Sequence, residues 1–153
     1  MKKAPVARTQ MLIRRPVNEV FQAFVDPDIT TRFWFTKSSG PLKKGARLRW
    51  EWEMYGASAD VRVKAVEPDS RILIEWHDPP CPVEWQFHDR KDGTTLVVVS
   101  NWGFAGSEDE IVVQAIDSMG GFSFMLASLK ALLEHNIQLN LVADHHPDAH
   151  VGK

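Results

Sequence analysis

The sequence predicts an α+β fold in which a curved antiparallel sheet wraps around one long C-terminal helix, with two short helices after the first strand. Apolar and polar residues alternate in short segments between residues 47 and 104, as expected for antiparallel strands with one buried face. Short turn sequences rich in Gly, Pro and Asp separate these segments. A single long apolar stripe at helical spacing follows after residue 107.

Composition limits the classes of protein. The 153 residues are 44% hydrophobic and 25% charged, which is typical of one globular domain. A formal net charge of −2 argues against a nucleic-acid partner. One cysteine, Cys81, excludes an internal disulfide. We find no window of about 18 apolar residues and no apolar stretch after the N-terminal lysines, so we expect no membrane span, no signal peptide and a cytoplasmic location.

The N-terminal segment predicts one strand and two short helices. Residues 6–14 have strand composition, and Pro16 suits the first position of a helix. That helix is expected to end at Asp26-Pro27-Asp28, because proline disfavours a helical residue before it. Residues 29–34 are expected to form the second helix.

The alternating segments predict which side chains face the interior. Trp50 and Trp52 alternate with Arg49, Glu51 and Glu53, so the rings share one face and the charges the other. We interpret this charged face, with Arg62 and Lys64, as solvated surface. The inner faces of the next three strands are Val61, Val63 and Ala65; Ile72, Ile74 and Trp76; and Val83, Trp85 and Phe87. The last strand is expected over residues 94–104, where Ser100 shares a face with Leu96, Val98 and Trp102.

Ser107 and Glu110 form a capping box, S-x-x-E, that predicts the start of the long helix. The helix is expected to reach Asn136, with Gly120-Gly121 as a kink or a close approach to the sheet. Its predicted buried stripe is Ala115, Met119, Phe122, Leu126, Leu129, Leu133 and Ile137. We expect residues 1–138 to form one domain and residues 139–153 a polar, His-rich tail.

Several motifs in this order resemble the START-like (SRPBCC, helix-grip) superfamily and, within it, the activator of heat-shock protein ATPase homologue (AHSA-type) domains. They are the opening helix at residues 15–24, the Trp34 that ends the second helix, the strand entry at 44–50, V-x-P-x-x-R-I at 66–72 followed by Trp76, and Gly121-Phe122. Phe122 stands where the family usually has tryptophan. The resemblance covers residues 6–137 and implies a cavity between sheet and long helix.

The aromatic set has two interpretations. Six Trp and eight Phe could form a well-packed core, which composition alone favours, or they could line a cavity, which the resemblance implies. In the second case the site would bind a small apolar or aromatic molecule without evident catalysis. The predicted lining is Trp34, Trp50, Trp52, Met54, Trp76, Trp85, Phe87, Ser100, Trp102, Met119, Phe122 and Leu126. Further polar groups near the helix stripe are Asp117, Ser118 and Ser123.

Two alternative functions remain open from sequence. One is an enzyme of the polyketide cyclase/aromatase or hydrolase kind, which an inward-facing His, Tyr, Asp or Arg would favour. The only tyrosine, Tyr55, is expected off the ring face. The other is a regulator of a heat-shock chaperone ATPase, which would need a large exposed patch.

No cofactor or metal is expected. Cys81 lies among prolines in a predicted loop, where it could be exposed, but no base is placed beside it. His145, His146 and His150 form an H-H-x-x-x-H cluster of metal-ligating residue types, which we interpret as part of a loose tail that begins at Asp144.

Overall fold

The computed structural model describes residues 4–148. In chain order the elements are β1 (Ala7–Ile13), α1 (Val17–Val25), α2 (Pro27–Thr30), β2 (Lys37–Ser38), β3 (Arg47–Trp52), the 3-10 turn η1 (Glu53–Tyr55), β4 (Ala57–Glu67), β5 (Arg71–Trp76), β6 (Cys81–Asp89), β7 (Thr95–Asn101), α3 (Glu108–His135) and α4 (Leu141–His145).

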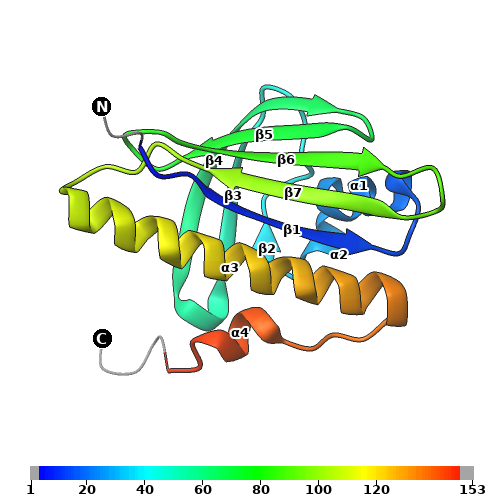
Figure 1. Ribbon diagram of the computed structural model, residues 1–153. Helices are drawn as coiled ribbons and strands as arrows, with labels where there is room; N and C mark the ends of the chain where they lie inside the picture. Colours follow the sequence, from blue (N-terminus) through cyan, green and yellow to red (C-terminus); the bar gives the residue numbers. More distant parts are fainter. Residues whose placement is uncertain (1–3, 149–153) are drawn as a thin grey trace.

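The seven strands form one antiparallel sheet in the order β1-β7-β6-β5-β4-β3-β2. The sheet curves so that β3 and β4 pass behind α3, while α1 and α2 close the opposite end (Figure 1). The outer face carries cross-strand pairs such as Arg49 with Asp60 (3.9 Å) and Lys64 with Glu75 (3.7 Å). The predicted fold class and the solvated charged face are confirmed.

The second helix begins earlier than predicted. Asp26 ends α1 and also caps α2, because its carboxylate accepts a hydrogen bond from the Asp28 amide at 3.0 Å. Pro27 therefore starts a helix rather than only ending one, since its missing N–H costs nothing at the first position. Thr30 then donates to the carbonyl of Ala23 at 2.6 Å and fixes the angle between the two helices.

Two strands end earlier than predicted. β3 stops at Trp52, because η1 and the left-handed Gly56 (φ 64°) turn the chain back toward β4. Met54 therefore leaves the inner face of the sheet. β7 stops at Asn101 rather than at Phe104.

Helix α3 has the predicted capping box, and the expectation for its start is confirmed. Ala115, Phe122, Leu126 and Leu129 are buried as predicted. Met119 is 50% exposed, however, and the other residues of the N-terminal half of α3 are also mostly exposed. Ile137 lies beyond the helix, and Met125 and Leu132 complete the buried face instead.

The expectation that the chain has no apolar window of about 18 residues is wrong for α3. Its most apolar 18-residue window has a mean hydropathy of 1.3, so by length and composition this helix could cross a membrane. One such helix is weak evidence of a span, because the core helix of a folded domain passes the same test. Here Met125, Leu126 and Leu129 are fully buried in the core.

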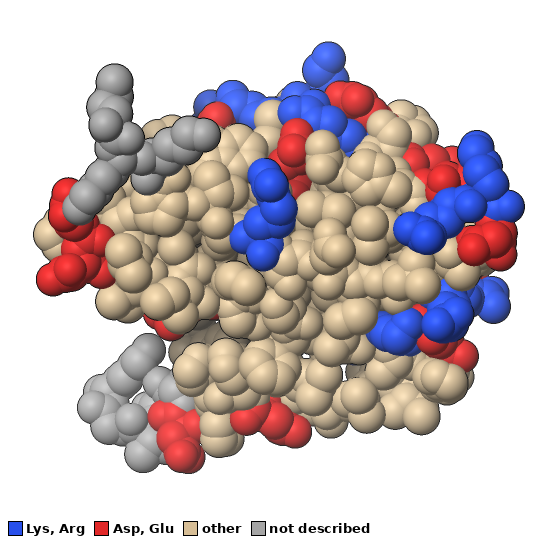
Figure 2. Space-filling model, in the orientation of Figure 1, with Lys and Arg blue, Asp and Glu red and all other residues tan. Residues whose placement is uncertain are grey.

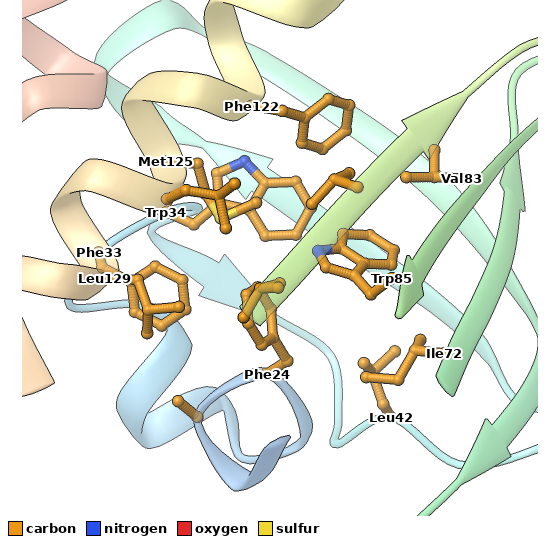
Figure 3. Packing of buried hydrophobic residues seen from close by; sticks show 14 of the residues in the cluster. Phe24, Phe33, Trp34, Leu42, Ile72, Val83, Trp85, Phe122, Met125 and Leu129 are labelled. Carbon is orange, nitrogen blue, oxygen red and sulfur yellow. The ribbon is translucent and has the colours of Figure 1, made fainter. Parts of the chain in front are cut away.

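The core is centred on Trp34, which follows α2 and is 7% exposed. Its ring centroid lies 5.0 Å from that of Trp50, 5.7 Å from Trp85 and 5.8 Å from Phe122. Figure 3 shows Trp34 between Met125 of α3 and Trp85 of β6, with the Trp85 nitrogen directed toward the Trp34 ring. That nitrogen has no hydrogen-bond partner in the described chain.

Replacing Leu129, which is fully buried on α3, should cost about 2–5 kcal/mol of unfolding free energy in Leu129→Ala, because the cavity left behind cannot collapse. Leu139→Ala, at a position 46% exposed, should change it by less than about 0.5 kcal/mol. Urea unfolding followed by circular dichroism measures both. Equal effects would contradict the placement of α3.

Candidate functional site

A cavity of about 380 Å³ lies between the N-terminal half of α3, the end of the sheet formed by β3, β5, β6 and β7, and helix α4. Figure 2 shows gaps in the surface between α3 and α4. The lining residues are Trp34, Trp52, Tyr55, Trp76, His77, Cys81, Asn101, Phe104, Gln114, Asp117, Ser118, Gly121, Phe122, Phe124, Val142, His145 and His146.

Four rings form an apolar part of this lining. Trp76 stacks on Phe122 with centroids 6.0 Å apart and an angle of 21° between the rings. Trp34 meets Phe122 at 5.8 Å, and Trp52 meets Trp76 at 6.3 Å. Because the same rings contact the core, packing fixes this part of the site before any ligand binds.

Helix α4 closes one side through ring contacts. His145 lies 4.3 Å from Phe124 of α3 and 4.2 Å from His146, whose ring lies 6.3 Å from Tyr55. The sequence interpretation missed this helix and treated residues from Asp144 as loose. The apolar residues Leu139, Leu141 and Val142 within this otherwise polar segment were the available signal.

Gly121 provides space in the site. A Cβ built on Gly121 meets no atom within 4 Å, and the residue lines the cavity. A Cβ on Gly120 would instead lie 4.0 Å from the His145 ring. The predicted close approach of this pair to the sheet is wrong: Gly120 faces α4, and α3 continues as one helix through both residues.

The buried polar groups of the site are already paired. Ser118 and the Asn101 side-chain oxygen share a 2.7 Å hydrogen bond, and the Asn101 amide donates to the Pro82 carbonyl at 2.9 Å. Cys81 is 5% exposed and begins β6, so the expectation of an exposed loop cysteine is wrong. Its thiol lies 3.3 Å from the carbonyl of Gly103, within the range of a weak S–H hydrogen bond.

Three titratable groups of the lining, Tyr55, His77 and Cys81, have pKa values shifted toward their neutral forms. Burial raises the pKa of the Tyr55 hydroxyl, and the charge of Asp144 raises it further. Burial lowers the pKa of His77, and so does the positive charge of Arg62. Burial also raises the pKa of Cys81, so the thiol is not activated as a nucleophile.

The structure separates the predicted lining residues into groups. Trp34, Trp52, Trp76 and Phe122 line the cavity, and so do the suggested polar residues Asp117 and Ser118. Four others are core residues that do not reach it: Trp50, Trp85, Phe87 and Leu126. Met54 lines a separate cavity of about 90 Å³ together with Ser128.

Three remaining residues point elsewhere. Ser100 accepts a hydrogen bond from Arg8 at 3.1 Å on the outer face, and Met119 faces solvent. Trp102, beyond the end of β7, does not line the cavity. In β7 the buried alternation is Thr95, Val97 and Val99, so Asn101 rather than Ser100 faces the cavity. Ser123 bonds to Thr9 of β1 at 2.7 Å.

Tyr55 and His77 were not predicted to face the site. Tyr55 enters through η1, and His77 follows β5 with a left-handed backbone (φ 67°). The alternation of apolar and polar residues could not predict either position, because both residues lie just after the end of a strand. The enzyme alternative required an inward-facing His, Tyr, Asp or Arg, and Tyr55, His77 and Asp117 do line the cavity. Within residues 4–148, however, no hydrogen bond joins these three side chains to one another.

Metal ligation has no support in the described chain. Residues 4–148 contain no group of three His, Cys, Asp or Glu side chains that could hold a metal ion. His150, the third histidine of the sequence cluster, lies outside the described residues.

Comparison with protein families gives a match over residues 14–134 to the family described as "Activator of Hsp90 ATPase homolog 1-like protein". The match covers well over half of the chain. The chain belongs to this AHSA1 family. The helix-grip fold that the sequence motifs implied is the fold of these AHSA1 domains, and the expected resemblance is confirmed. A comparison with curated proteins gives no match.

Solved AHSA1-like structures share the architecture. The protein SSP2350 from Staphylococcus saprophyticus is 30% identical, with a TM-score of 0.76 over 88% of this chain and 96% of that one. DynU16, a protein from the dynemicin biosynthetic locus, is 24% identical with a TM-score of 0.76, over 87% of this chain and 48% of that one. The Aha1 dimer from Colwellia psychrerythraea is 16% identical with a TM-score of 0.73, over 86% and 97% of the two chains.

NMR titration of the His77 ring should give a pKa below the ordinary value of about 6.5, and Arg62→Gln should raise it part of the way back. The unfolded chain therefore takes up this proton first, and stability falls as pH drops from about 6.5 through the folded pKa. Lys64→Gln removes a neighbouring charge as the control and should leave the His77 titration unchanged. A His77 pKa that is identical in the Arg62 variant would contradict the assignment.

Proposed function

We propose that this AHSA1 domain binds a small apolar or aromatic molecule in the cavity between α3, the sheet and α4, without catalysing a reaction. The observation that carries the proposal is a space of about 380 Å³ bordered by Trp34, Trp52, Trp76 and Phe122. Native cores leave few voids larger than a water molecule, whereas ligand sites occupy about 300–1,000 Å³ and are mostly apolar. A cytoplasmic location is part of the same proposal.

The absence of catalysis rests on the state of the polar groups. A nucleophile needs an adjacent base or a lowered pKa, but Cys81 has a raised pKa and its nearest acceptor is a carbonyl. Ser118 is held by Asn101, an amide that cannot take its proton. These contacts support binding rather than acyl transfer or hydrolysis.

Gly121→Leu tests the binding function directly. The new side chain enters open space and also improves helix propensity, so we expect unchanged or higher stability with loss of binding. The probe is the neutral dye N-phenylnaphthylamine, monitored by its own emission and by tryptophan quenching. Gly121→Ala is the control: it should gain about 1 kcal/mol of stability and still bind the dye. A Leu variant that binds the dye like the parent would refute the proposed site.

A second candidate function is activation of an Hsp90-type ATPase through protein contact, as the description of the family implies. One observation favours it. The N-terminal half of α3 exposes a row of large apolar side chains, Val112, Val113, Ile116 and Met119, of which Ile116 is 65% exposed. Sequence analysis identified no such patch. Exposed apolar rows of this kind mark protein contacts in other domains.

Ile116→Glu separates the two candidates. If the apolar row contacts a chaperone, this change should abolish stimulation of Hsp90 ATP hydrolysis while dye binding stays intact, and Gly121→Leu should have the opposite pattern. Phosphate release measures the first property. No stimulation by the parent protein would exclude the second candidate function.

A further inference from the structure

The cavity has a distinctive charge distribution. Among the described residues, 4–148, the 17 that line the cavity include no lysine or arginine, and the one carboxylate among them is Asp117 of α3. Within residues 4–148, no ion pair or hydrogen bond engages the Asp117 side chain, which is exposed at the edge of the cavity. An acidic ligand entering here would meet this charge and no lysine or arginine among the described lining residues.

Neighbouring charges strengthen this asymmetry. The negative charge of Asp144 of α4 interacts electrostatically with the Tyr55 hydroxyl, so a second carboxylate contributes to the potential in the site. Arg62 reaches the edge, where it donates to the His77 carbonyl at 3.0 Å, but Glu75 lies 3.9 Å from its guanidinium and offsets it. In Figure 2 the described surface around α4 shows Asp and Glu, whereas the Lys and Arg of this face lie along the upper edge, near the centre and at the right-hand end.

The ring-lined part of the cavity has a matching preference. Trp34, Trp52 and Trp76 place three indoles within 6.4 Å of one another, centroid to centroid. Indole faces carry negative electrostatic potential and attract cations, most strongly where water is excluded. Rings and carboxylate therefore select the same sign of ligand charge.

From this arrangement we infer that the ligand is a flat aromatic or apolar molecule carrying an ammonium group, with its ring against the tryptophans and its cationic end near Asp117. The inference rests on the proposed binding function and specifies its substrate class. It disfavours fatty acids and other carboxylates, for which a cavity of this shape would otherwise be suitable.

Three probes with one common group test the inference. The naphthylmethyl group is small enough for the cavity and can carry trimethylammonium, hydroxyl or carboxylate. Isothermal titration calorimetry at about pH 8, where imidazole is ordinarily neutral, gives the three dissociation constants. We expect the ammonium probe to bind about tenfold more tightly than the carboxylate, with the alcohol in between.

Asp117→Asn removes the charge but keeps the shape of the side chain. It should weaken the ammonium probe about fivefold and leave the alcohol unchanged. Asp109→Asn, two turns earlier on α3 and outside the cavity lining, removes the same charge as the control and should affect neither probe. Equal losses in both aspartate variants would overturn the role of Asp117, because they would indicate a general charge effect.

The outcomes distinguish this inference from the function on which it rests. If the alcohol or carboxylate binds as tightly as the ammonium probe, and Gly121→Leu abolishes that binding, the cationic preference is wrong while the cavity remains the binding site. If none of the probes binds, or Gly121→Leu binds them all like the parent, the cavity function itself fails and the inference fails with it.

Discussion

The packing of Trp34 is the contact on which both the core and the cavity depend. Its indole is nearly buried, and it touches rings from β3, β5, β6 and α3. One side of this cluster belongs to the tight core around Trp50 and Trp85, and the other borders the open space. Removing the Trp34 side chain would therefore disrupt both the packing of the core and the wall of the cavity. The rigidity of the site is a consequence of core packing rather than a separate device.

Periodicity predicted the fold because most of the chain has a single buried face. The alternation in β3, β5 and β6 and the S-x-x-E box before α3 are local patterns, and the structure follows them. In β4 a bulge between Val63 and Ala65 shifts the alternation, so Val66 rather than the predicted Ala65 packs against the core. The errors lie where an element ends, where a bulge shifts the period, or where the period was started on the wrong residue. Met54 was placed on the inner face because the two-residue period of β3 was extended into η1. Ser100 was placed there because the period of β7 was started on the wrong residue, and a slip of one residue moves a side chain to the opposite face.

The candidate site could be predicted only in part. Trp52, Trp76 and Phe122 follow from alternation and helical spacing, but composition cannot tell a ring that packs from a ring that borders a void. Trp50 and Trp85 are buried in the core, two and nine residues from Trp52 and Trp76 respectively. Tyr55, His77 and the α4 residues reach the cavity through turns and a short helix. Their positions depend on tertiary contacts such as that between His145 and Phe124, which no local pattern encodes.

The attachment of α4 has a consequence for exchange between the cavity and solvent. None of the five residues of α4 is buried. Val142 packs against the core, His145 contacts Phe124, and His146 just after the helix contacts Tyr55. Separating α4 from α3 exposes little apolar surface, whereas parting two strands would break a ladder of backbone hydrogen bonds. The path of lowest free-energy cost into the cavity therefore runs past α4. Under the proposed binding function, those few contacts control the residence time of the ligand, which can then change without any change in the global stability of the fold.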